Sequence, residues 1–105
     1  TELHFVDTMH ERKAKMVSLS DGVIALPGGF GTFDELFEIL TWSQLDIFHG
    51  PVGVLNVNGF YDLLLNQLDK MEEEGFLTQQ TRNLLFSSDN IEDLLDQMER
   101  VNPSN

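Results

Sequence analysis

Short apolar runs alternate with stretches of helical periodicity along the chain. The runs at 23–26, 52–57 and 84–87 have the length and composition of strands that are buried on both faces of a parallel sheet. The stretches with helical periodicity follow these runs, at 33–48, 60–74, 78–83 and 91–101. The alternation predicts an α/β fold, in which a parallel sheet is flanked by helices.

The segment before the first of these strands predicts one further helix. It runs from about Met9 to Ser20, with Asp7 or Thr8 as its cap, and Asp21-Gly22 ends it. Residues 3–6 have the character of a strand, with no earlier strand beside which to pair. Three short strands also make a narrow sheet for this many helices. We therefore expect residues 1–105 to form one α/β domain that is part of a larger fold and lacks its N-terminal strands.

A glycine-rich loop, Pro27-Gly28-Gly29-Phe30-Gly31-Thr32, joins the first predicted strand to the helix at 33–48. Glycines allow the backbone to approach an anion closely, and the helix that follows adds the positive end of its dipole. The loop matches neither G-x-G-x-x-G nor the Walker sequence, which ends in Gly-Lys-Ser/Thr. The pattern is typical of a phosphate site, although a purely structural glycine turn fits it as well.

Thr32 and Glu35 have two interpretations. Thr-x-x-Glu at a helix start is a capping box, in which the two side chains bond the free backbone amides. In the functional interpretation, the Thr32 hydroxyl binds a phosphate and the Glu35 carboxylate faces a ribose. The spacing alone leaves both open.

Charge narrows the choice of partner. The formal net charge is −12, and half of the six basic residues lie within four positions, at Arg12, Lys13 and Lys15. Such an acidic protein repels nucleic acid and anionic membranes, so we expect neither as a partner. The basic cluster is either a solvated helix face or a local anion site.

The absence of cysteine excludes disulfides, a thiol nucleophile and a Cys-based zinc site, and we expect a reducing, cytoplasmic location. No apolar run of the sequence is long enough to cross a bilayer.

Two motifs resemble the paired signature of the Lonely guy (LOG) family, M-H-x-R-K and P-G-G-x-G-T-x-x-E. The matching segments are Met9-His10-Glu11-Arg12-Lys13 and Pro27 to Glu35, and segments 41–45 and 50–57 also resemble the family. These proteins are cytokinin riboside 5′-monophosphate phosphoribohydrolases, often mislabelled lysine decarboxylases. The resemblance implies a Rossmann-like fold. Because family members are longer and begin with further strands, it also implies that this chain is the C-terminal half of a LOG-type nucleotide-binding domain.

The resemblance implies a role for each matched residue. Arg12 and Glu35 would be catalytic, and Lys13 would lie beside Arg12 in the nucleotide site. The 5′-phosphate would be held by the loop residues Gly29, Phe30, Gly31 and Thr32, and Thr41 would be a further substrate contact. The family needs neither a metal nor an organic cofactor. A lysine decarboxylase would need pyridoxal phosphate on a lysine, and none of the three lysines lies in a recognisable cofactor motif.

The implied reaction is hydrolysis of the N-glycosidic bond of a purine nucleoside 5′-monophosphate, AMP or a cytokinin nucleotide, to free base and ribose 5-phosphate. Cleavage builds positive charge on the ribose, which a carboxylate stabilises. The alternatives are a non-catalytic nucleotide carrier or sensor with the same loop, and an inactive half-domain.

The predicted helix at 33–48 is apolar around much of its circumference. A helix that covers one face of a sheet needs only a stripe about 100° wide. Family members are homodimers, so we expect a homodimer with this helix in the contact.

Overall fold

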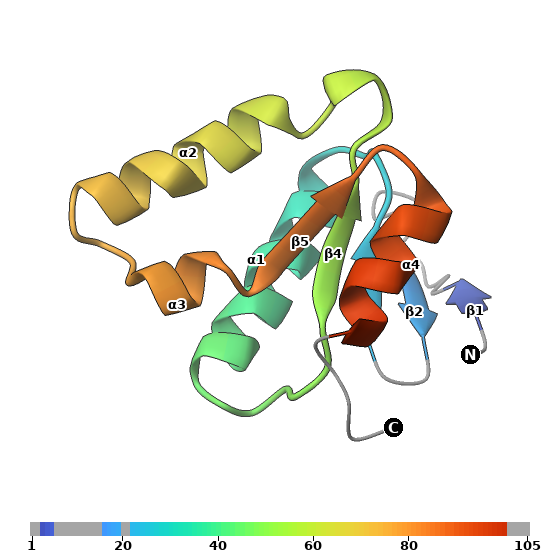
Figure 1. Ribbon diagram of the computed structural model, residues 1–105, viewed down its shortest axis with the longest axis horizontal. Helices are drawn as coiled ribbons and strands as arrows, with labels where there is room; N and C mark the ends of the chain where they lie inside the picture. Colours follow the sequence, from blue (N-terminus) through green and yellow to red (C-terminus); the bar gives the residue numbers. More distant parts are fainter. Residues whose placement is uncertain (1–2, 6–15, 20–21, 101–105) are drawn as a thin grey trace.

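The sheet is five-stranded, and its strands are ordered as they occur in the sequence (Figure 1). The computed structural model describes residues 3–5, 16–19 and 22–100, the first two as backbone only. The strands are β1 (Leu3–Phe5), β2 (Met16–Leu19), β3 (Val23–Ala25), β4 (Val52–Leu55) and β5 (Leu85–Ser88). The last three are parallel, as predicted, whereas β1 and β2 pair antiparallel.

Helices cover both faces of the parallel strands, which makes three layers. α1 (Phe30–Gln44) and α2 (Asp62–Glu73) share one core with β4 and β5, built around Leu36, Val54 and Leu68. α4 (Ile91–Arg100) packs on the opposite face, with Leu94 and Met98 against β3. Figure 1 shows α4 in front of the sheet and α1 behind it. The arrangement confirms the predicted Rossmann-like α/β class.

Residues 16–19 form a strand, so the prediction of a helix over 9–20 is wrong there; its other residues lie outside the described part. β2 pairs with the free edge of β3, from Met16 opposite Ala25 to Ser18 opposite Val23. Asp-Gly between two apolar runs is a hairpin signal as well as a helix stop, and here the hairpin forms. β2 in turn pairs with β1, so the strand at the N-terminal end finds its partner later in the chain.

α1 begins three residues before the predicted start and ends four residues before the predicted end. Gly29 is its N-cap, so Phe30 and Gly31 belong to the first turn. At the other end, Asp46 adopts a left-handed conformation (φ 63°). The amides of Asp46 and Ile47 then donate to the carbonyls of Ser43 and Trp42. This is a Schellman motif, which closes the helix before Gly50-Pro51 is reached.

The remaining elements lie close to their predicted positions. A 3-10 turn, η2 (Val57–Gly59), precedes α2, and α3 (Gln79–Arg82) precedes β5. Thr78 caps α3, and Asn90 caps α4 by accepting a 2.9 Å bond from the Asp93 amide. Among the described helices, none combines the length and apolarity that a membrane span requires.

Candidate functional site

The connections that follow β3, β4 and β5 gather at the carboxyl edge of the sheet, at the top of Figure 1. In open α/β sheets this edge is where ligands bind. The first connection is the glycine loop into α1, the second leads into η2, and the third leads into α4. The predicted loop therefore lies on the edge that the fold class uses for ligands.

The N-terminus of α1 presents backbone amides at this edge. The amides of Phe30, Gly31 and Thr32 precede the first intrahelical donor, Phe33, whose amide donates to the Gly29 carbonyl over 3.2 Å. No side chain of the described residues caps this end, and its first turn holds no acid. A β-carbon added to Gly29 would meet no described atom within 4 Å. None of the described side chains therefore covers this helix start.

Thr32 does not cap α1, so the capping interpretation of Thr32 is wrong. With Gly29 as the N-cap, Thr32 is the third helical residue, and its side chain is fully buried. The Thr32–Glu35 capping box is ruled out by the same shift, because Glu35 lies in the second turn, beyond the free amides. Glu35 is half-buried there.

Thr41 lies away from the other predicted site residues. It follows Thr32 by nine residues, about two and a half turns, so it faces the opposite side of α1. Its hydroxyl donates to the Phe37 carbonyl one turn back, over 2.8 Å. Thr41 borders an apolar pocket of about 140 Å³ that α1, α2, α3 and the start of β5 enclose. The structure does not bring it together with Thr32 and Glu35.

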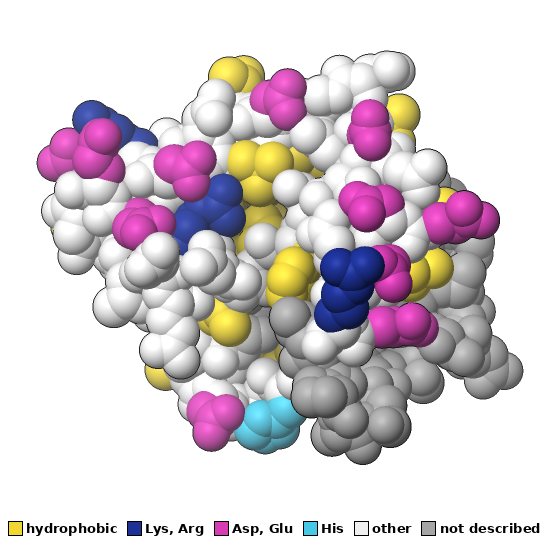
Figure 2. Space-filling model, in the orientation of Figure 1, with side chains coloured by type: hydrophobic (Ala, Val, Ile, Leu, Met, Phe, Trp, Pro, Cys, Tyr) yellow, Lys and Arg dark blue, Asp and Glu magenta, His cyan; other side chains and the backbone are white. Residues whose placement is uncertain are grey.

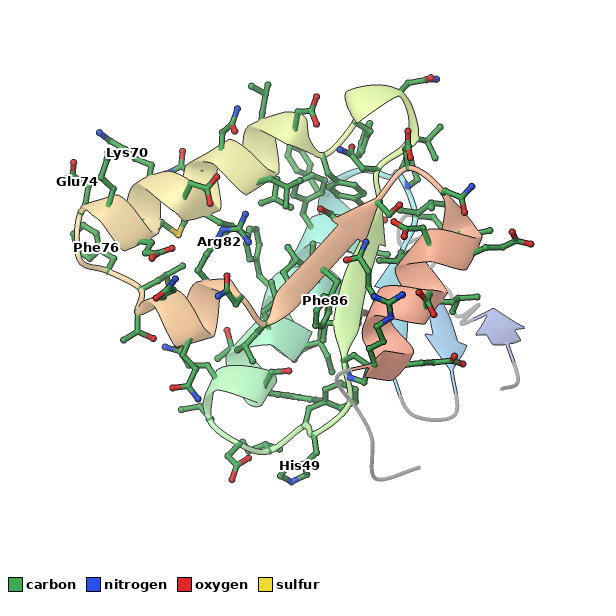
Figure 3. All side chains as sticks on the ribbon, viewed as in Figure 1. His49, Lys70, Glu74, Phe76, Arg82 and Phe86 are labelled. Carbon is green, nitrogen blue, oxygen red and sulfur yellow. The ribbon has the colours of Figure 1, made fainter. Side chains whose placement is uncertain are left out.

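Arg12 and Lys13 lie outside the described residues, so their predicted place beside Glu35 stays a prediction. The three cations of residues 22–100 are all paired with acids: Lys70 with Glu73 and Glu74, Arg82 with Asp69, and Arg100 with Asp96. Figure 2 shows each of them against acidic side chains, and Figure 3 places Lys70 beside Glu74.

All three cations also occupy the last turn of a helix, where the dipole favours them. The described residues therefore bring the N-terminal amides of α1 to the carboxyl edge but no unpaired Lys or Arg side chain. They also hold no cluster of three metal-ligating residues.

The sequence did not point to Tyr61, whose side chain contacts the start of the glycine loop. It is fully buried, and its hydroxyl donates a 2.6 Å bond to the Leu26 carbonyl, where the loop begins. Burial raises the pKa of Tyr61 to about 12, so the phenol stays protonated and able to donate. The Tyr61 amide donates over 2.7 Å to Asn56, which follows β4. The nearby sequence signal is the Asn58-Gly59 turn, which does not by itself indicate the contact with Leu26.

A parallel sheet between two layers of helices, with a glycine loop at its carboxyl edge, defines a Rossmann-like α/β protein. The sequence model of the family described as "Possible lysine decarboxylase" matches residues 1–98. The chain belongs to this family, the Lonely guy (LOG) family, as the two sequence motifs indicate.

Similar proteins with known names support this family assignment. A cytokinin riboside 5′-monophosphate phosphoribohydrolase of Arabidopsis thaliana is 51% identical over 102 residues, which are 97% of this chain and 48% of the relative. A "probable" enzyme of the same name from Oryza sativa subsp. japonica is 47% identical over equal shares. The chain spans about half the length of these relatives.

Proposed function

We propose that the protein hydrolyses a purine nucleoside 5′-monophosphate, AMP or a cytokinin nucleotide, to the free base and ribose 5-phosphate. The observation that carries the proposal is the open N-terminus of α1 at the carboxyl edge, within the sequence that matches the family signature. The named relatives are phosphoribohydrolases of cytokinin riboside 5′-monophosphates. Because the chain spans half of their length, it acts as one half of a larger nucleotide-binding domain.

The 5′-phosphate binds at the start of α1. The amides of Phe30 and Gly31 donate to its oxygens, and Gly29 leaves room for the approach. The charge of the phosphate needs a cation as well, and residues 22–100 offer none that is not already paired. Arg12 and Lys13 of the M-H-x-R-K motif supply it, since Arg in particular binds phosphate through two donors.

Glu35 acts at the ribose. Its position one turn beyond the first amides of α1 supports a role at the sugar of a nucleotide whose phosphate binds there. As the glycosidic bond breaks, the ribose gains oxocarbenium character, and the carboxylate stabilises it or attacks it. Arg12 keeps its proton at ordinary pH, so it orients Glu35 and the ribose and is not the acid that protonates the departing base.

The protein assembles as a homodimer through α1. Leu36 is buried in the chain's own core, whereas Phe37, Trp42, Leu45 and Ile47 along the second half of α1 and its end are 40 to 62% exposed. Scattered apolar residues are ordinary on a surface, but four on a single helix and its exit form a patch that a partner subunit covers.

The test is an assay of the full-length protein with AMP and with isopentenyladenosine monophosphate, followed by chromatography. We expect free base and ribose 5-phosphate in equal amounts. Glu35→Gln should lower turnover by about a hundredfold or more, as expected for loss of a catalytic carboxylate. Glu38→Gln is the matched control, because Glu38 is an exposed acid on the next turn of the same helix.

Two results would contradict the proposal. Binding of the nucleotide without release of base, in the wild type, would favour a carrier or sensor. Equal turnover in the Glu35→Gln and Glu38→Gln variants would remove Glu35 from the reaction.

A further inference from the structure

Tyr61 contacts both ends of the glycine loop. At the start of the loop its hydroxyl donates to the Leu26 carbonyl over 2.6 Å. At the other end its ring packs against Phe33 in the first turn of α1, with 5.6 Å between ring centroids. The residues between these two contacts are Pro27 to Thr32, which include every amide assigned to the phosphate.

Tyr61 is itself fixed by the neighbouring strand. Asn56 follows β4, and its side-chain oxygen accepts the Tyr61 amide over 2.7 Å. The amide group of Asn56 donates in turn to Asp62 over 2.8 Å, and the Asn56 backbone amide donates to Ser88 at the end of β5 over 2.8 Å. Through its hydroxyl and its backbone amide, Tyr61 therefore connects residues at the carboxyl ends of all three parallel strands.

We propose that Tyr61 is a positioning residue that sets the shape of the phosphate loop. The inference rests on the proposed function. Three of the loop's residues are glycines, so the loop has many accessible conformations of its own. The Tyr61 hydroxyl and ring hold the loop at its two ends, so that its amides point together before the phosphate arrives. Tyr61 does not touch the reacting atoms.

The experiment compares full-length wild type with Tyr61→Phe and Thr78→Ala. The first variant removes only the hydroxyl. The second removes the cap of α3, where the Thr78 hydroxyl accepts the Thr81 amide, and it is the matched control for lost stability outside the carboxyl edge. Three quantities are measured: KM and kcat for AMP, the inhibition constant of inorganic phosphate, and amide hydrogen exchange along the chain.

In Tyr61→Phe we expect KM and the phosphate inhibition constant to rise together by about fivefold, the factor for one ordinary hydrogen bond, with kcat within about twofold of wild type. Exchange of the amides from Gly28 to Thr32 should quicken by about tenfold, and other segments should change little. Thr78→Ala should leave KM and loop exchange at wild-type values.

A Tyr61→Phe protein with wild-type KM, or with faster exchange spread over the whole chain, would overturn the proposal and leave the proposed function standing. If the wild type releases no base from any nucleoside monophosphate, the proposed function fails. Loop exchange in Tyr61→Phe then still decides whether Tyr61 holds the loop.

Discussion

Glu35 illustrates how a three-residue shift of a helix start changes the meaning of a motif. From the sequence, the Thr32–Glu35 spacing fits a cap and a catalytic carboxylate equally well. In the structure the helix begins at Phe30, so the carboxylate has no free backbone amide to bond. The capping interpretation is therefore excluded for Glu35.

This gives the first prediction on stability. Glu35→Gln should change the free energy of unfolding by less than about 0.5 kcal/mol, because it breaks no cap and no described ion pair. Leu36→Ala is the reference, since Leu36 is fully buried and should cost about 2–5 kcal/mol. Urea denaturation measures both. A loss in Glu35→Gln near that of a missing cap, about 1 kcal/mol, would restore the capping interpretation.

The second prediction at the residue scale concerns Tyr61 and the pH dependence of the free energy of unfolding. Its pKa is raised from 10.0 to about 12, because burial disfavours the phenolate. The folded state thus holds this proton more tightly than the unfolded state. The stabilisation is complete below pH 10 and is lost as the pH rises toward 12, at up to about 1.4 kcal/mol per pH unit.

The measurement is unfolding by urea at pH values below 10 and between 10 and 12. Wild type should lose stability over this interval more steeply than Tyr61→Phe, which has no group that titrates there at this position. Parallel curves for the two proteins would mean that the phenol is not buried as described.

At the scale of elements, the helix ends decide where each helix lies. α4 begins at Ile91, after Asn90, whose side chain accepts the Asp93 amide. Hydrogen bonds from Ser88 and then Gln97 hold the pKa of Asp93 below its usual value. Two residues after β5, Asp89 and Asn90, are of types that commonly cap a helix. The sequence does not show which of the two is the cap.

The third prediction separates them. Asn90→Ala should lower the free energy of unfolding by about 1 kcal/mol, the usual cost of a lost cap. Asp89→Ala should change it by less than about 0.5 kcal/mol. Thermal or urea unfolding of the two variants gives the answer, and the reverse ranking would place the cap at Asp89.

Most elements were predictable because each carries its own local signal. The apolar runs of β3, β4 and β5 are bounded by Gly, Pro or Asn, and α2 is followed by Gly75, which has a left-handed φ of 89°. The strand β2 was not predictable, because Met16-Val17-Ser18-Leu19 reads as either element until the edge of β3 is known. Tertiary pairing overrides local periodicity there.

The site was predictable to the extent that it is contiguous in sequence. The loop and Glu35 follow one strand, so their place at the carboxyl edge follows from the fold class. Tyr61 was not predictable, since its link to Leu26 joins positions 35 residues apart. Thr41 is the opposite case: it is close to Glu35 in sequence, but the two residues do not lie on the same face of α1.

At the scale of the whole molecule, the proposed homodimer would cover the exposed apolar side chains of α1 and its end. The fourth prediction is that the full-length protein sediments as a dimer at micromolar concentration. Charges at Leu45 and Ile47, both 62% exposed, should turn it into a monomer while the fold is kept. We therefore expect a Leu45→Glu, Ile47→Glu variant to sediment at half the mass.

Leu63→Glu is the matched control, because Leu63 is 82% exposed on α2, away from this patch. It should remain a dimer. Dissociation by Leu63→Glu, or a double variant that stays dimeric, would move the contact away from α1.

The order of the strands has a consequence for how the chain folds. β3, β4 and β5 are neighbours both in sequence and in the sheet, so each parallel pairing closes over a single crossover. Loop closure costs least for such short separations, and they speed folding. β4 pairs on both edges, and its Gly53 lies so close to α4 that an added β-carbon would come within 2.9 Å of Met98. We expect this strand to open last, which makes its amides the slowest in the chain to exchange with deuterium.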